Sequence, residues 1–349
     1  MIRLAWRQFR TQALIAVGGV ILLAAVIAAT RPHLTSLYDT NVANCATRDN
    51  CETATRAFLQ TDRDLRGWLD ILVVVVPGLL GAFWGAPLVA RELETGTFRL
   101  AWTQSITRSR WLGVKLGMVG LCSMAVAGLA SLMVSSWATR LDQVGEDRFG
   151  VFDMRGIVPI GYAAYAVMLG VLIGVIMRRA VPAMATTLVV FVSTRLAFVH
   201  LIRPRLMTAV VQEVALEPTR MGFGSRDGGP MTIQPEPPHL PNAWFQSIHI
   251  VDRAGHALSA DAVSTACPDL ASMGPPTEEG TRSAGPVPDQ VKHGLEDCIT
   301  KLGNTYHQVV NYQPANRYWT FQWIELGIFL GASLLVAGAC FWWVRRRLR

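Results

Sequence analysis

The sequence predicts an all-α polytopic membrane protein with six transmembrane helices. Of its 349 residues, 51% are hydrophobic and 16% are charged, and the mean hydropathy is +0.31. Soluble domains usually carry about 25% charged residues. Six apolar stretches also reach the roughly 20 residues that a helix needs to cross a hydrocarbon core. These stretches cover residues 13–30, 68–90, 113–138, 156–177, 181–202 and 321–344.

Residues 1–12 place Arg3, Arg7 and Arg10 among apolar side chains. This mixture predicts a short interfacial helix at the membrane surface, with a plain basic flank of the first span as the alternative. A basic start before an apolar stretch is also typical of a signal peptide. The alanines of 24–29 keep that alternative open, but no convincing cleavage site with a polar mature start follows them. We therefore interpret 13–30 as a retained span.

The distribution of basic residues predicts the orientation in the membrane. With both termini inside, the inner segments hold 14 Lys and Arg against 2 acidic residues, and the outer segments hold 17 against 21. Basic residues favour short cytoplasmic segments. We therefore expect two cytoplasmic termini, and the net charge of +7 gives no reason to expect nucleic acid as a partner. The inner segments are 1–12, 91–112 with Lys115, 178–180 and 345–349, and the outer ones are 31–67, 139–155 and 203–318.

Four of the six cysteines fall in the predicted outer segments. Because disulfides persist in oxidising compartments, we expect the pairs Cys45–Cys51 and Cys267–Cys298, with free thiols as the alternative. The four residues show no CxxC spacing and no His at a ligand offset, so no metal site is predicted.

The outer segment 203–318 predicts an extracellular domain between spans five and six. Its turn-rich composition, with a low-complexity stretch at 272–289, favours irregular structure with few regular elements. Two exceptions are a predicted strand at 244–252 and a predicted helix at 288–303.

Glycines four residues apart recur in the spans, and such small faces allow close helix packing in lipid. The pairs are Gly81 and Gly85, Gly113 and Gly117, Gly170 and Gly174, and Gly327 and Gly331.

The sequence carries no phosphate-binding loop, no HExxH and no GxSxG. We therefore expect no catalytic residue and no cofactor in this chain. Charges at membrane depth are the unusual feature, because they are costly and usually find a partner or a water-filled cavity. For Arg195 and Glu325 three alternatives stand: they pair with each other, Arg195 extends unpaired toward the interface, or Arg195 contacts a substrate.

Residues 91–112 form a charged insert between spans two and three. The spacing of Leu93, Thr97 and Leu100 predicts a short helix over about 91–103, with acidic residues near its start, where the helix dipole favours them. A surface helix of this kind suits docking of a partner, and a plain connecting loop is the alternative.

This insert resembles the coupling helix of permease subunits in ABC exporters of the second membrane-domain type. The ending 311–335 resembles actinobacterial members with a long loop before the last span. Gln104 stands where that family usually has a proline, and the segment 203–318 is longer than its common loop. The residues expected to couple to the ATPase are Arg91, Glu92, Glu94, Gly96, Thr97, Arg99, Arg110 and Lys115.

The resemblance implies an efflux permease in a bacterial plasma membrane. It would act with a second permease copy, identical or a paralogue, and with cytoplasmic ATPase subunits that bind ATP and Mg. The expected domains are 1–12, 13–202, 203–318 and 319–349. The alternative is a membrane-anchored surface or sensory protein whose extracellular domain binds a partner. A polytopic enzyme is disfavoured, because no acid, base or metal cluster occurs at membrane depth.

Overall fold

The computed structural model describes residues 2–43, 51–96, 107–217, 221–225, 231–267 and 289–347. The chain divides into two compact units. The first, here called the membrane unit, comprises Met1–Leu206 and Arg317–Arg349. The second, here called the sheet unit, comprises Met207–Asn316.

The described residues contain six helices that are long and apolar enough to cross a membrane, which confirms the predicted fold class. Most of these helices extend beyond the predicted apolar stretches, because charged residues at their ends continue the helix. The spans are Phe9–Thr40, Arg63–Thr95, Ser109–Gly145, Val158–Met177, Ala180–Arg205 and Ala315–Arg346.

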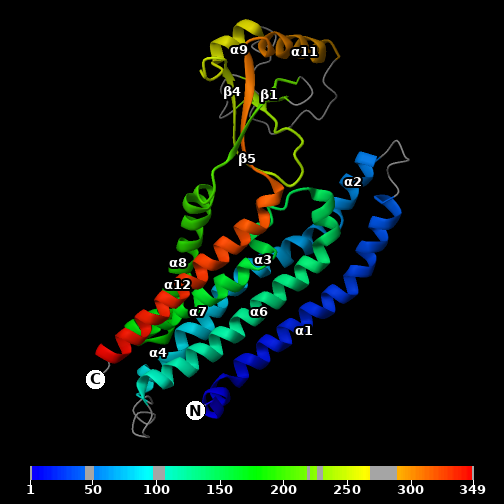
Figure 1. Cartoon of the computed structure of the whole chain (residues 1–349). Coiled ribbons are helices and arrows are strands. Elements are labelled where there is room, and N and C mark those ends of the chain that lie inside the picture. Colours follow the sequence, from blue (N-terminus) through cyan, green and yellow to red (C-terminus); the bar gives the residue numbers. More distant parts are fainter. Residues whose placement is uncertain are drawn as a thin grey trace. The chain divides into compact units, whose positions relative to one another are not determined.

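The membrane unit is a helix bundle in which both termini lie at the same end (Figure 1). We call that end the base and the opposite end the top. Three spans are composite, since short π or 3-10 turns lie within the second and fifth and a 3-10 turn begins the sixth. The elements are α1 (Ile2–Asn41), α2 (Cys51–Gln60), α3 (Arg63–Leu80), η2 (Gly81–Gly85), α4 (Ala86–Thr95), α6 (Arg108–Gly145), η3 (Phe152–Met154), α7 (Val158–Met177), α8 (Ala180–Ala197), η4 (Phe198–Ile202), η5 (Arg203–Arg205), η7 (Ala315–Arg317) and α12 (Tyr318–Arg347).

The first helix runs without a break from Ile2 to Asn41. Residues 2–12 contain no Gly or Pro that would end a helix. They therefore continue into the first span, and the structure has no separate interfacial helix there. This arrangement favours the alternative that residues 1–12 are a basic flank of span one.

The fourth span, α7, lies at the centre of the bundle, and 67% of its most apolar 18-residue stretch is buried. Two predicted glycine pairs explain how closely its neighbours approach. A Cβ on Gly170 would lie 2.3 Å from the Gly81 carbonyl oxygen, and one on Gly174 would lie 2.4 Å from that of Ala86. The predicted packing role is thus confirmed for the pairs on η2 and α7. By contrast, an added Cβ on Gly327 or Gly331 would meet no described atom within 4 Å.

The sheet unit is more regular than its turn-rich composition predicts. It contains a three-stranded antiparallel sheet of order β1-β5-β4 and a separate hairpin of β2 and β3. The first and last strands pair in the register Val210↔Tyr312, and a contact so distant in sequence leaves no local pattern. The elements are β1 (Val210–Ala215), β2 (Met221–Ser225), β3 (Met231–Pro235), β4 (Trp244–Asp252), α9 (Ala260–Ala266), α11 (Asp289–Gly303) and β5 (Tyr306–Gln313).

Three local predictions for this unit are confirmed. The strand β4 covers the predicted residues 244–252, and α11 matches the helix expected at 288–303. Cys267 and Cys298 form a disulfide, with their Cα atoms 5.3 Å apart, that links α9 to α11. Cys45 lies outside the described residues, so its expected pairing with Cys51 stays a prediction.

Candidate functional site

The charged insert begins at the base of the bundle, where span two ends. Residues 91–95 are the last part of α4, which ends at Gly96 with a positive φ of 72°. Glycine adopts this left-handed conformation without strain and often ends helices. Arg91, Glu92 and Glu94 therefore sit on the end of a span. Thr97 and Arg99 lie outside the described residues, so the coupling helix over 91–103 stays a prediction.

A buried ion pair joins the two ends of the insert. The Lys115 Nζ lies 2.5 Å from the Glu92 Oε1, and Lys115 is only 4% exposed. The same ammonium group donates to the Leu88 carbonyl at 3.5 Å and lies 4.7 Å from the centre of the Trp111 ring. Breaking a buried pair by removing one partner typically costs about 3–5 kcal/mol. Lys115 therefore holds α4 to α6 next to the insert, at the base of the bundle.

Glu94 has a structural partner in a third span. Its Oε2 accepts a hydrogen bond from the Ala180 amide at 3.2 Å, where α8 begins. The first amides of a helix lack partners within the helix, and a carboxylate there is stabilised by the helix dipole. Glu94 thus connects span two to span five. Arg91 and Arg110 instead expose their side chains at the base.

At the top of the bundle, a buried ion cluster surrounds Glu325; we call it the Arg203 cluster. The Arg203 guanidinium donates to both oxygens of Glu325, at 2.9 Å each, and Glu325 is fully buried. Arg203 also contacts Asp153, which accepts from the Tyr162 hydroxyl at 2.8 Å. The Arg195 Nη2 lies 3.2 Å from Asp153 Oδ1. Two arginines and two carboxylates thus balance their charges, as burial demands.

This cluster changes the sequence-based alternatives for Arg195 and Glu325. Each has its own partner, since Glu325 pairs with Arg203 and Arg195 pairs with Asp153. They nevertheless belong to one network, because Arg203 and Asp153 connect them. Arg203 and Asp153 fall in the predicted outer segments, so the sequence did not predict their role.

Burial alone would raise the pKa of the Asp153 carboxyl. The positive charges of Arg203 and Arg195, with hydrogen bonds from Arg203 and Tyr162, outweigh burial and lower that pKa below its usual value. Asp153 lies in η3 within the 146–157 connection and is ionised at neutral pH. The carboxylate is therefore a fixed negative charge that holds Arg195 and Arg203 together.

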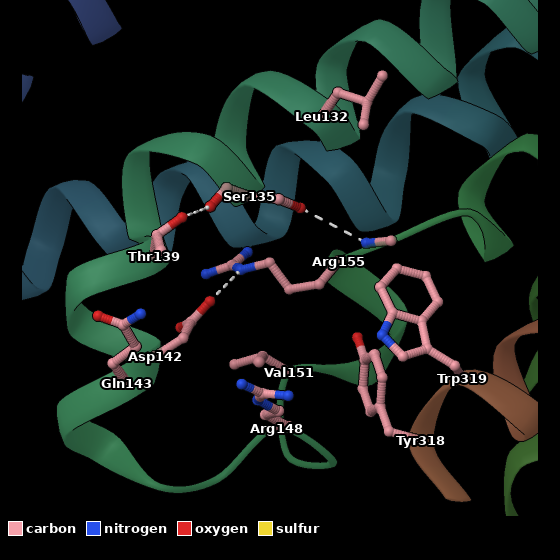
Figure 2. A pocket seen from close by; sticks show the side chains of 11 residues that line it. Leu132, Ser135, Thr139, Asp142, Gln143, Arg148, Val151, Arg155, Tyr318 and Trp319 are labelled. Carbon is pink, nitrogen blue, oxygen red and sulfur yellow. Dashed lines mark hydrogen bonds and ion pairs between the residues drawn. The ribbon is translucent and has the colours of Figure 1, made fainter. Parts of the chain in front are cut away.

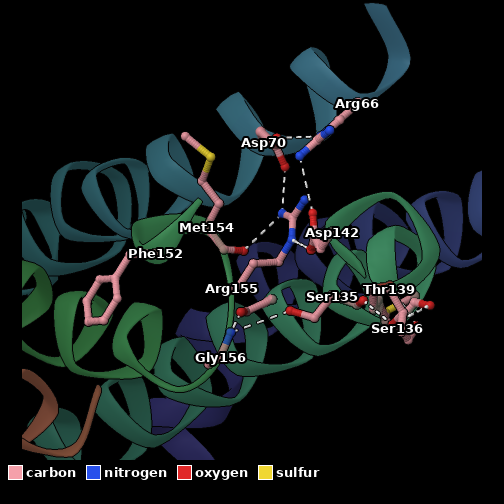
Figure 3. A network of polar contacts seen from close by, with 12 residues as sticks. Arg66, Asp70, Ser135, Ser136, Thr139, Asp142, Phe152, Met154, Arg155 and Gly156 are labelled. Atoms are coloured by element: carbon pink, nitrogen blue, oxygen red, sulfur yellow. Dashed lines mark hydrogen bonds and ion pairs between the residues drawn. The ribbon is translucent and has the colours of Figure 1, made fainter. Parts of the chain in front are cut away.

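A second ion cluster, the Arg155 cluster, lies on the other side of the same connection. Arg155 is 5% exposed and contacts Asp70 Oδ1 through Nη1 at 2.6 Å and Asp142 Oδ2 through Nε at 2.8 Å. Arg66 donates to Asp142 at 3.2 Å. Figure 3 shows the Arg155 guanidinium between the two carboxylates. Burial opposes the charge, but the bonds to Asp142 and Asp70 prevail and raise the Arg155 pKa.

The fully buried amide of Gln322 fixes the connection between the clusters. Its Oε1 accepts from the Ile157 and Val158 amides at 3.0 and 3.1 Å. Its Nε2 donates to the Phe152 and Arg155 carbonyls at 3.1 and 3.2 Å. Residues 152–158 are thereby held on α12. Sequence inspection offers no signal for this role, since one glutamine in an apolar helix is not distinctive.

A pocket of about 390 Å³ with a mixed polar and apolar lining adjoins the Arg155 cluster. Figure 2 shows Arg155, Arg148 and Asp142 near one another, with the rings of Tyr318 and Trp319 nearby. Such a pocket can hold a polar molecule by hydrogen bonds. Among the described residues, no group of three or more His, Cys, Asp or Glu could bind a metal ion.

Residues 17–203 match the family described as ABC-2 membrane transporter related, which covers more than half of the chain. The chain belongs to this family. The matched region of the ABC-2-related chain holds every charged member of the two clusters except Glu325. Family membership and the six spans make it a multi-pass membrane protein of the transporter-permease kind. Comparison with curated proteins and with solved structures gives no match.

Proposed function

We propose that this chain is the membrane-spanning permease subunit of an ATP-driven exporter. A separate ATPase subunit, which binds ATP and Mg, docks on the insert between α4 and α6. The observation that carries the proposal is that the residues at the start of the insert are bonded to two neighbouring spans. The Glu92–Lys115 pair joins α4 to α6, and Glu94 joins α4 to α8. A force applied to the insert therefore reaches three spans.

A permease of this kind works as a dimer, and the least buried spans support that part of the proposal. The first span has 11% of its most apolar 18-residue stretch buried within the chain, and the fifth and the sixth have 22% each. We propose that a second permease copy, identical or a paralogue, packs against the first and fifth of these spans and completes the translocation path. The spans then move as rigid bodies when the ATPase subunits close.

The base is proposed to face the cytoplasm of a bacterial cell, with both termini inside. The positive-inside distribution of Lys and Arg supports this orientation. The Cys267–Cys298 disulfide supports it independently, because the sheet unit then lies in the oxidising exterior.

A second candidate function is favoured by the sheet unit. This unit has its own hydrophobic cluster around Val263, Cys267, Cys298 and Leu302. A membrane-anchored surface or sensory protein would bind its partner there. If the chain is such a surface or sensory protein, removing residues 208–315 should abolish partner binding. If the chain is an exporter permease, the same deletion should leave ATPase binding intact.

The experiment is copurification of the full chain with a candidate ATPase, followed by ATP hydrolysis in proteoliposomes. We choose Arg91→Glu because Arg91 is exposed, whereas Glu94 also supports α8. Arg10→Glu on α1 is the matched control, with the same charge change at the same end. We expect Arg91→Glu to reduce ATPase stimulation at least about tenfold, the equivalent of ~1.4 kcal/mol, and the control to retain it. Unchanged complex formation and ATP turnover in Arg91→Glu would overturn the proposal, as would ATP hydrolysis by the lone chain.

A further inference from the structure

The guanidinium of Arg195 is incompletely satisfied. Arg195 is 9% exposed, and its Nη2 binds Asp153 while its Cζ lies 3.9 Å from the centre of the Tyr162 ring. Its Nη1 is buried and has no hydrogen-bond partner in the described part of the chain. A buried unpaired donor of a charged group is unfavourable, and such groups are rare in proteins.

Arg195 lines a cavity of about 340 Å³ between α3 and α8. Apart from Arg195 and Asp153, the lining is formed by apolar residues and Gly78. Val75, Val192 and Leu196 line the cavity and are 43%, 50% and 55% exposed on the surface of the bundle. In the membrane such a surface faces hydrocarbon wherever the proposed second copy does not cover it. The cavity therefore opens sideways out of the bundle, within the membrane, and its volume falls in the range of small-molecule sites.

The electrostatics of this cavity favour an acceptor as its occupant. The Asp153 carboxylate is already bonded by Arg203, Arg195 and Tyr162, so its oxygens are engaged. Among the described residues that line this cavity, Arg195 Nη1 is the buried side-chain donor without a hydrogen-bond partner. Hydrogen bonds from a guanidinium to a carboxylate or phosphate are about twice as strong as neutral ones.

We propose that this cavity binds an amphipathic molecule with an anionic head. A carboxylate or phosphate accepts a hydrogen bond from Arg195, and the hydrocarbon tail lies along Val75, Val192 and Leu196. The head belongs either to a lipid of the bilayer or to the exported molecule. Only the second source rests on the proposed exporter function.

The test measures binding of radiolabelled dodecanoate to the purified full chain in phosphatidylcholine nanodiscs. Dodecanol is the uncharged probe with the same tail. We expect dodecanoate to bind at least about tenfold more tightly than dodecanol. Arg195→Gln should remove this difference, and Arg205→Gln, an exposed arginine on η5, should retain it. Equal affinity for the two probes, or full dodecanoate binding by Arg195→Gln, would overturn the proposal.

A second variant keeps the test decisive if Arg195→Gln does not fold. Val192→Trp fills the cavity and leaves the charges of the Arg203 cluster in place. It should reduce the binding of both probes at least about tenfold. Unchanged dodecanoate binding by a folded Val192→Trp chain would also overturn the proposal.

Two further measurements identify the source of the head group. Anionic phospholipid that copurifies with the wild-type chain, and less with Val192→Trp, identifies a bilayer lipid. ATP-dependent movement of dodecanoate in proteoliposomes with the partner ATPase, lost in Val192→Trp, identifies the exported molecule. If the chain binds dodecanoate but no ATPase, the exporter proposal fails and the binding site stands.

Discussion

Replacing Glu325 by glutamine tests the Arg203 cluster. Glu325 accepts two bonds from Arg203 and contacts the Tyr162 hydroxyl. Glutamine keeps one acceptor oxygen, but its amide group then faces an Arg203 or Tyr162 donor. A lost bond to a charged group costs about 1.5–3 kcal/mol, and an unpaired buried charge costs about 3–5 kcal/mol. Because Arg203 retains Asp153, we expect Glu325→Gln to lower the free energy of unfolding by about 3 kcal/mol.

The assay is unfolding of the purified chain by sodium dodecyl sulfate in mixed micelles, read as a double-mutant cycle. Arg203→Gln and Glu325→Gln together should destabilise the chain at least about 1 kcal/mol less than the sum of the single variants. The matched cycle of Arg195→Gln with Glu325→Gln should give a smaller coupling, because Asp153 and Arg203 separate that pair. Additivity within about 0.5 kcal/mol for Arg203 and Glu325 would refute the reasoning, as would a stronger coupling of Glu325 to Arg195.

Three more predictions follow from packing, charge and covalent structure. Gly170→Ala should greatly reduce the yield of folded protein, because its Cβ would lie 2.3 Å from a carbonyl oxygen, whereas Gly331→Ala should leave the yield unchanged. The stability supplied by Asp153 is present above the unfolded pKa of about 3.9 and is lost as the pH falls through the lower folded value, so acid should destabilise wild type more than Asp153→Asn in pH-dependent unfolding. The bond between Cys267 and Cys298 closes a loop of 31 residues, so Cys267→Ser should destabilise the sheet unit by about 3–4 kcal/mol, measured as increased proteolysis within residues 207–316. Equal yields of the two glycine variants, parallel acid curves, or unchanged cleavage would contradict these expectations in turn.

The sequence predicts the six spans because apolar length is a local property. Hydropathy also explains why the sequence did not predict the Arg203 and Arg155 clusters. Asp153, Arg155 and Arg203 stand just beyond the apolar windows and look like ordinary loop charges. Their partners are distant, since Arg203 and Glu325 are 122 residues apart and Arg155 and Asp70 are 85 apart. No local pattern encodes such pairs.

The sheet unit shows the same difference between local signals, which the sequence reveals, and long-range contacts, which it does not. The strand β4 has a local run of residues typical of strands, and the helix α11 has a proline just before its start and a glycine at its end. Both elements occur as predicted. The pairing of β1 with β5 brings together the two ends of a segment of about 100 residues. Irregular composition between two strands therefore does not exclude a sheet built from its ends.

The connection at residues 146–157 contributes to both the Arg203 cluster and the Arg155 cluster. Asp153 and Arg155 are separated by one residue, yet they enter different clusters, and Gln322 holds the backbone beside both. The top is therefore fastened by eight charged side chains across α3, α6, α8 and α12. At the base, α4 is held to α6 by the Glu92–Lys115 ion pair and the Lys115 hydrogen bond to the Leu88 carbonyl, and to α8 by one hydrogen bond. Arg345 on α12 also donates to Ser109 on α6. Breaking several buried pairs costs far more than breaking one.

An ATPase that acts on the insert would therefore pivot the spans about the top. In the proposed exporter, distances between spin labels at the base of the two permease copies should change through the ATP cycle, while those at the top stay constant. The position of the Arg203 cluster also predicts how the Arg195 cavity responds to such a pivot. Because its polar end belongs to the fastened top and its apolar lining extends along α3 and α8, a pivot changes the space for a tail and leaves the Arg195 contact with the head in place.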